Sequence, residues 1–60
     1  MMDIKRRHLY MIMRKEKHIK HNDIAKAIGV SQSAISQYET GKISLKHETR
    51  SAYERYIENN

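Results

Sequence analysis

The sequence predicts a small all-α domain, a bundle of four to five short helices. The chain contains no proline and only two glycines, Gly29 and Gly41, so few residues interrupt helical structure. Its apolar residues recur at helical spacing rather than alternating as in a strand. No internal repeat and no linker rich in Pro, Gly or Ser divides the chain, so residues 1–60 are expected to form a single domain.

The first helix is expected over about residues 3–17, with Asp3 as a candidate N-cap. One group of apolar side chains is expected to face the core: Leu9, Tyr10 and Met13. A second group lies on another side of the helix: Ile4, Met11 and Ile12. With this second group, the helix has more apolar residues than one narrow core-facing side requires. It either packs within the domain or forms an apolar strip that binds a partner.

Two short helices joined by a tight turn are expected in the middle of the chain. The second helix starts near Asn22 and ends at Gly29, which suits the left-handed residue after a helix. Ser31 caps the third, which runs from Gln32 to about Thr40, where Gly41 closes it. The small residue Ala25 lets the two helices cross closely. This arrangement is typical of a helix-turn-helix.

A fourth helix is expected from about Leu45 to Glu58, with Ser44 as its N-cap. Its apolar residues form a wide stripe at helical spacing: Leu45, Thr49, Ala52, Tyr53, Tyr56 and Ile57. The first part of this stripe should cover the core.

The stretch Asp23-Ile-Ala-Lys-Ala-Ile-Gly-Val-Ser-Gln-Ser-Ala-Ile-Ser-Gln-Tyr-Glu-Thr-Gly-Lys42 resembles the helix-turn-helix of the Cro/C1-type (XRE-like) repressors. The resemblance covers about residues 9–45 and is strongest from Ala25 to Lys42. It implies a lambda-repressor-like DNA-binding bundle, here in a minimal single-domain version of the phage or mobile-element type. It also implies an internal ion pair between Arg14 and Glu39, tying the first helix to the third.

In this family the second helix of the motif enters the major groove of DNA. The resemblance therefore places the base contacts on the polar face of the third helix, at Gln32, Ser33, Ser36 and Gln37. Contacts to DNA phosphates are expected at Lys20, His21, Ser31, Thr40 and Lys42. The family commonly has a glutamine where His21 stands, and a histidine can also donate to a phosphate.

A homodimer on a palindromic operator is the expected mode of binding, because it presents two such helices about 34 Å apart. The end of the fourth helix, where the family's usual fifth helix would cover it, is the expected dimer contact, at Tyr53, Tyr56 and Ile57. Ile4 and Met11 on the first helix are further candidates for a dimer or partner interface. The alternative is that the tyrosines fold back onto the first helix.

The composition suits a polyanionic partner, with a net charge of +5 and a pI near 9.8. Residues 1–30 carry eight Lys or Arg against three acidic residues, whereas residues 31–60 carry four of each. The chain has no cysteine and no apolar run near the length of a membrane span, so a cytoplasmic location is expected. No catalytic constellation, metal site or cofactor site stands out, so we expect a regulator that is not an enzyme.

A second function fits the same features. The third helix carries no cation, and the first helix has surplus apolar residues. A helix-turn-helix scaffold of this kind could act as a co-repressor, docking on another transcription repressor and modulating it without reading DNA.

Overall fold

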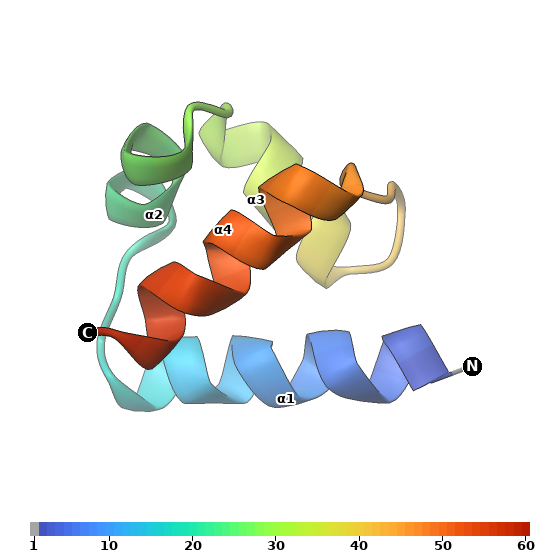
Figure 1. The fold of residues 1–60 in the computed structure, drawn as a ribbon, viewed down its shortest axis with the longest axis horizontal. Coiled ribbons are helices and arrows are strands. Elements are labelled where there is room, and N and C mark those ends of the chain that lie inside the picture. The colour runs from blue at the N-terminus through green and yellow to red at the C-terminus, as the bar shows by residue number, and fades with distance from the viewer. Residues whose placement is uncertain (1) are drawn as a thin grey trace.

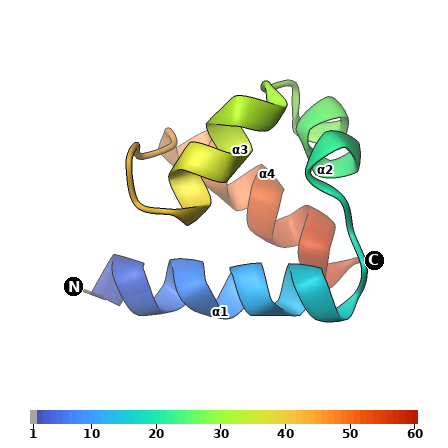
Figure 2. The same ribbon diagram turned by 180° about the vertical axis from the view of Figure 1, so that it is seen from behind.

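The computed structural model describes the backbone of residues 2–60 and the side chains of residues 5–60. Four helices follow one another along the chain: α1 (Met2–Glu16), α2 (His21–Ile28), α3 (Gln32–Glu39) and α4 (His47–Glu58). The long helix α1 forms a base, and the other three helices lie on one side of it (Figures 1 and 2). The described residues contain no strand. The all-α bundle predicted from the sequence is therefore confirmed, with four helices.

The turn between α2 and α3 has the geometry that the sequence predicts. Gly29 follows α2 in the left-handed conformation, with φ of 77°, and its N–H donates to the carbonyl oxygen of Ala25 at 2.9 Å. Two residues later the Ser31 hydroxyl accepts a hydrogen bond from the backbone N–H of Ala34 at 3.0 Å, which caps α3. Ala25 on α2 is buried, and α2 packs against α3. These caps fix the crossing of the two helices.

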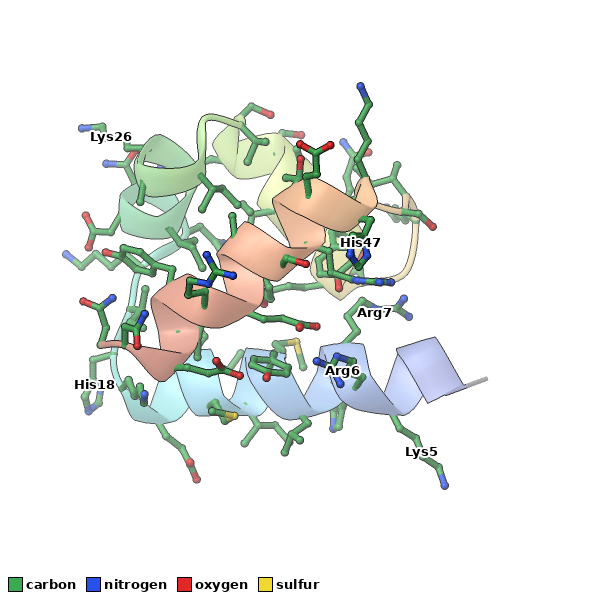
Figure 3. All side chains as sticks on the ribbon, viewed as in Figure 1. Lys5, Arg6, Arg7, His18, Lys26 and His47 are labelled. Atoms are coloured by element: carbon green, nitrogen blue, oxygen red, sulfur yellow. The ribbon has the colours of Figure 1, made fainter. Side chains whose placement is uncertain are left out.

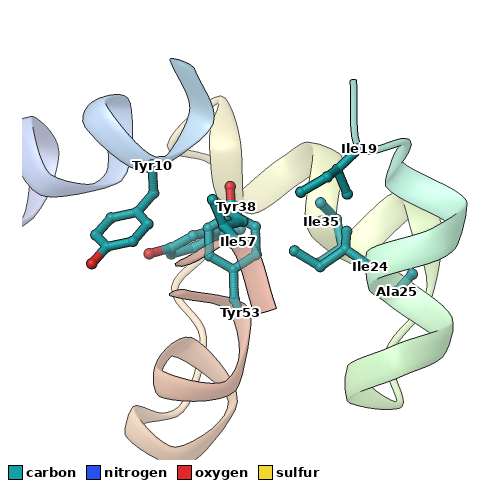
Figure 4. Packing of buried hydrophobic residues seen from close by; sticks show 8 residues of the cluster. All are labelled: Tyr10, Ile19, Ile24, Ala25, Ile35, Tyr38, Tyr53 and Ile57. Atoms are coloured by element: carbon teal, nitrogen blue, oxygen red, sulfur yellow. The ribbon is translucent and has the colours of Figure 1, made fainter. Parts of the chain in front are cut away.

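The core contains side chains from every helix and from the α1–α2 link (Figure 4). Its buried members are Tyr10, Ile19, Ile24, Ala25, Ile35, Tyr38, Tyr53 and Ile57. The rings of Tyr38 and Tyr53 meet edge to face, with centroids 5.3 Å apart, and join α3 to α4. The core therefore holds α3 in place from its inner side.

The segment before α4 differs from the sequence expectation. Helix α4 begins at His47 after Lys46, so the expectation of a helix from Leu45 with Ser44 as its cap is wrong. Ile43 and Leu45 both pack against the core, while Ser44 between them is exposed. Residues two apart share a face only in extended backbone, so burying both side chains keeps this segment out of the helix.

The end of α4 also differs from expectation. Tyr53 and Ile57 are 0% exposed within a single chain, so the expectation that they form a dimer contact is wrong. Helix α4 packs against both α1 and α2, and its apolar stripe contributes Tyr53 and Ile57 to the core. Tyr56 is half-buried beside Ile28 in a shallow groove between α2 and α4. Of the other two interface candidates, Met11 is half-buried, and the side chain of Ile4 lies outside the described residues.

The inner side of α1 is more polar than the sequence suggests. Arg6 donates two hydrogen bonds of 2.8 Å to Glu54 on α4, and the Tyr10 hydroxyl donates to Glu58. The hydrogen bond to Glu58, together with burial, raises the pKa of Tyr10. Lys17 donates to the carbonyl oxygen of Ile57 at 2.5 Å, which suits the negative end of α4.

The expectation that Leu9 lies on this inner side is wrong. Its side chain is 56% exposed, because Tyr10 and Arg14 take the inward positions instead. Ile12 is also exposed, whereas Met13 packs at the edge of the core. Within the part of the chain that the structure describes, no helix is long and apolar enough to cross a membrane.

Candidate nucleic-acid interface

Helix α3 presents a polar face to solvent and an apolar face to the core. Its exposed side chains include the four proposed base contacts: Gln32, Ser33, Ser36 and Gln37. Ile35 and Tyr38 point the other way and are at most 5% exposed. The spacing of these residues over two helical turns produces the separation. The structure therefore brings the four candidate residues together on one accessible surface.

Two of these four residues are already joined by a hydrogen bond. The Gln37 amide nitrogen donates to the Ser33 hydroxyl at 2.9 Å, one helical turn away. This leaves the amide oxygen, one amide hydrogen and the Ser33 hydroxyl hydrogen for other partners. An acceptor beside a donor is what a glutamine needs to bind the N6 and N7 atoms of adenine in the major groove. The pair can thus present its hydrogen-bonding atoms with the Gln37 side chain already positioned.

The two hydroxyl groups at the ends of α3 differ in what they can offer. The Ser31 hydroxyl oxygen accepts a hydrogen bond from the backbone N–H of Ala34, and the hydroxyl hydrogen remains able to donate to a phosphate. The Thr40 hydroxyl instead donates within the helix end, to the carbonyl oxygens of Ser36 at 3.1 Å and Gln37 at 3.2 Å. Its hydrogen would have to turn away from these oxygens to reach a phosphate.

The carboxylate of Glu39, at the end of α3, joins groups from all the other helices. Arg14 on α1 donates to it twice, at 2.7 and 2.9 Å. The Tyr53 hydroxyl on α4 donates at 2.6 Å, and His21 on α2 lies at 2.9 Å. Burial raises the pKa of Glu39, but the hydrogen bonds from Arg14, Tyr53 and His21 outweigh burial and hold that pKa below its usual value. The ion pair between Arg14 and Glu39 that the family resemblance implies is present, and it is buried.

His21 is therefore not an isolated surface group. An ionised carboxylate only accepts hydrogen bonds, so the ring nitrogen Nε2 that faces Glu39 carries a hydrogen. The ring nitrogen left for a phosphate is Nδ1, which donates only when the imidazole is protonated. His21 thus combines a structural contact with a conditional donor at the start of α2. The sequence indicates the donor but gives no sign of the contact with Glu39.

The positive charge near α3 comes from its neighbours. Lys20 precedes α2 and Lys42 follows α3, and both are exposed. The backbone N–H of Lys42 donates to the carbonyl oxygen of Gln37 at 2.8 Å, which fixes the start of that side chain relative to α3. Lys26 on α2 is exposed and points away from the bundle (Figure 3). These lysines can contact phosphates, while α3 itself carries none.

The α1–α2 link contains features that sequence reasoning missed. His18 adopts a left-handed conformation with φ of 60°, which few residues other than glycine favour. Ile19 is buried next to it, and its carbonyl oxygen accepts a hydrogen bond from Arg14 at 2.7 Å. Arg14 thereby fixes the entry into α2 as well as the end of α3. Among the described residues, no group of three or more His, Asp or Glu side chains is placed to hold a metal ion.

Comparison with known proteins identifies the family of the chain. A family model described as helix-turn-helix, of the Cro/C1 (XRE) type, matches residues 11–57. This match includes most of α1, the whole of α2 and α3, and α4 as far as Ile57. Neither the curated proteins nor the solved structures contain a match to the chain. The chain belongs to the Cro/C1-type helix-turn-helix family of DNA-binding transcription regulators.

Proposed function

We propose that the protein is a repressor that binds a palindromic operator as a dimer and acts by occupying that site. The observation that carries this proposal is the polar face of α3, on which four side chains able to bind base edges stand exposed above a buried apolar face. A helix held by Ser31 at one end and Glu39 at the other has little freedom to reorient. A rigid reading surface is what sequence discrimination requires.

In this proposal Gln32, Ser33, Ser36 and Gln37 contact bases. The phosphate contacts are made by Lys20, His21, Ser31, Thr40 and Lys42. Phosphate contacts fix the position of the protein on the duplex, and base contacts select the sequence. Because α3 has no cation, we expect electrostatic attraction to contribute less to affinity than in a protein with a basic reading helix.

The test is selection of bound fragments from a randomised duplex library at about 150 mM salt, where non-specific phosphate binding is weakened. The expected result is an enriched palindrome with half-sites about one helical turn apart. The variant Gln37→Ala tests one proposed base contact without disturbing the fold, because the side chain is exposed and contributes nothing to the core. It should enrich a sequence that is less defined at one position in each half-site.

A second candidate function is docking on another repressor, which the exposed Leu9 and Ile12 side chains favour. It predicts that no sequence is enriched and that the protein binds DNA only at low salt. In that outcome, substituting Lys20 or Lys42 with glutamate would leave regulation unchanged, whereas losing the exposed apolar residues would abolish it.

A further inference from the structure

The outer face of α1 carries the large apolar side chains that remain most exposed in the described part of the chain. Leu9 is 56% exposed and Ile12 is 39% exposed. They lie on the side of α1 opposite the buried Tyr10 and Arg14, so they do not contribute to the core. In both ribbon views no other element lies beyond this side of α1 (Figures 1 and 2).

Lys5 and Glu16 continue the same face at either end. Positions 5, 9, 12 and 16 follow a helical repeat and lie within a narrow stripe. Both end residues are exposed, and neither side chain makes a hydrogen bond or ion pair with any other described residue. Lys5 points away from the bundle in Figure 3. We call Lys5, Leu9, Ile12 and Glu16 the α1 stripe.

The charge pattern of the α1 stripe is complementary to itself in one orientation. If a second stripe lies antiparallel on the first, centred between positions 10 and 11, Lys5 faces Glu16 of the second copy at both ends. The same register places Leu9 against Ile12 of the second copy, twice, in the middle. We propose that the α1 stripe is the contact surface for a second copy of this chain. This inference deepens the proposed function by assigning the surface through which the dimer forms.

The orientation of the resulting dimer suits DNA binding. A two-fold axis that exchanges two antiparallel helices is perpendicular to the plane that contains both helices. If the second copy is placed below α1 in Figure 2, that plane is the plane of the picture, so the two-fold axis runs along the line of sight. In that view α3 lies in front of α4, and its buried Tyr38 contacts Tyr53 on α4. The exposed face of α3 therefore looks along the two-fold axis, and both copies present it on the same side.

The spacing also agrees with a two-fold operator. Each copy measures 21 Å in the direction that runs from α1 across the bundle in Figure 1. The axes of two packed helices lie about 8–10 Å apart, and each helix has a Cα radius of about 2.3 Å, so a gap of about 4 Å remains between the Cα atoms of the two copies. Adding this gap to the 21 Å extent of one copy puts the centres of the two copies about 25 Å apart. Helix α3 slopes from the side of each copy remote from α1 down toward α1 (Figure 2), and the position of its N-terminal part, which carries Gln32 and Ser33, increases the distance between the two reading surfaces. The result approaches the separation of about 34 Å between half-sites one turn apart.

The contact is small. A helix of 15 residues is about 22 Å long, and two such helices meeting along one face bury less surface than the interface of a stable dimer. The dimer should therefore be weak in free solution and become stronger on a duplex, where two half-sites hold the copies close together. Its ion pairs should also make the association sensitive to salt.

A charge exchange tests the register directly. Lys5→Glu sets two carboxylates against each other at both ends of the contact, and Glu16→Lys sets two ammonium groups against each other there. The double variant Lys5→Glu/Glu16→Lys restores opposite charges and has the same net charge as the natural chain. The measurement is sedimentation equilibrium of the 60-residue chain, without DNA, at concentrations up to about 1 mM, the range in which such small contacts associate. Lys26→Glu, on the exposed side of α2, controls for the change in net charge.

Each single variant should raise the dissociation constant about tenfold or more, and the double variant should return it to within about threefold of the natural value. An equimolar mixture of the two single variants should form a heterodimer more readily than either variant associates with itself. Leu9→Asp should abolish association while leaving the helical circular dichroism spectrum unchanged.

A natural chain that remains monomeric up to about 1 mM overturns the proposal, as does association that Lys5→Glu weakens no more than Lys26→Glu does. Failure of the double variant to restore association overturns the antiparallel register. Because no DNA is present in this experiment, these outcomes are independent of whether the protein reads an operator. A chain that selects a single half-site from a duplex library and stays monomeric would retain the reading function and lose the dimer surface.

Discussion

Arg14 on α1 and Glu39 at the end of α3 form a two-point contact, with Nε 2.7 Å from Oε2 and Nη2 2.9 Å from Oε1. The Arg14 side chain is 8% exposed and that of Glu39 is 4% exposed. If one of them is removed, water can therefore do little to solvate the charge of the other. The third nitrogen of Arg14 donates to the carbonyl oxygen of Ile19. One guanidinium therefore connects the base of the bundle, the entry into α2 and the end of the reading helix.

Replacing Arg14 by alanine should lower the free energy of unfolding by about 3–5 kcal/mol, because it leaves the buried charge of Glu39 without its main partner. Urea unfolding followed by circular dichroism measures the change. Arg14→Lys keeps the charge but loses the two-point geometry, and it should recover only part of the stability. An unchanged midpoint for Arg14→Ala would refute the structural role of this pair.

Acid should destabilise the protein through Glu39. Its folded pKa lies below the ordinary value of 4.5, so its stabilising contribution is complete above that value and is lost as the pH falls through the lower folded pKa. Unfolding free energies measured between about pH 6 and pH 2 should fall across this window. Glu39→Gln, which cannot ionise, should show a weaker dependence on pH in the same range. Equal slopes for the two proteins would contradict this assignment.

Alkali should destabilise the protein through Tyr53. Burial raises the pKa of its hydroxyl above the ordinary value of 10.0, and the hydrogen bond to Glu39 raises it further. Because the pKa of this hydroxyl is higher in the folded than in the unfolded protein, its contribution to the free energy of unfolding is complete below the unfolded pKa. That contribution should be lost as the pH rises above about 10. Tyr53→Phe removes this part of the alkaline loss. At neutral pH the same variant should cost about 1.5–3 kcal/mol, because it loses a hydrogen bond to a charged group.

Gln37→Ala should reduce specific DNA affinity by about 1–3 kcal/mol without changing the melting temperature, since the side chain is exposed. Fluorescence anisotropy with the selected operator and with an unrelated duplex separates the two kinds of binding. Binding to the unrelated duplex should stay the same. Ser33→Ala should have a smaller effect in the same direction, because it removes the group that positions the Gln37 amide. Equal operator binding by Gln37→Ala and the natural chain would exclude Gln37 as a base contact.

Ile57→Ala should destabilise the single folded chain by about 2–4 kcal/mol, as expected for a fully buried isoleucine. If Ile57 instead formed a dimer contact, the loss would depend on protein concentration. Thermal unfolding at two concentrations that differ about a hundredfold distinguishes these cases. Lys26→Ala, on the exposed side of α2 and outside the α1 stripe, is the surface control, and it should change stability by less than about 0.5 kcal/mol at either concentration.

The sequence predicted the parts of the fold that depend on local chemistry. Gly29 and Ser31 end and begin helices through their own backbone and side-chain atoms, so their neighbours along the chain suffice to identify them. The pair of Arg14 and Glu39 could be expected only through the family resemblance, because 25 residues separate its members. The proposed reading face followed from the same resemblance, and its contacts with DNA remain predictions.

The errors came from contacts between distant segments. Arg6 and Glu54 are 48 residues apart, and their pairing across α1 and α4 has no local signal. Apolar periodicity assigns the core side of α1 to Leu9, Tyr10 and Met13, and it is right for Tyr10 and Met13 but wrong for Leu9, which is exposed. The late start of α4 has the same origin, since only the assembled core shows that Leu45 must be buried from extended backbone.

The convergence of all four helices on the Glu39 carboxylate has a consequence for how the molecule opens. Local unfolding of α3 would break contacts to Arg14, His21 and Tyr53 at once, so no helix can detach without disturbing the others. We therefore expect the hydrogen-bonded amides of the reading helix to exchange their hydrogens with solvent mainly when the whole domain unfolds. Its dynamics are those of the entire bundle, and any substitution that weakens the bundle will also increase the fraction of time the reading surface spends unformed.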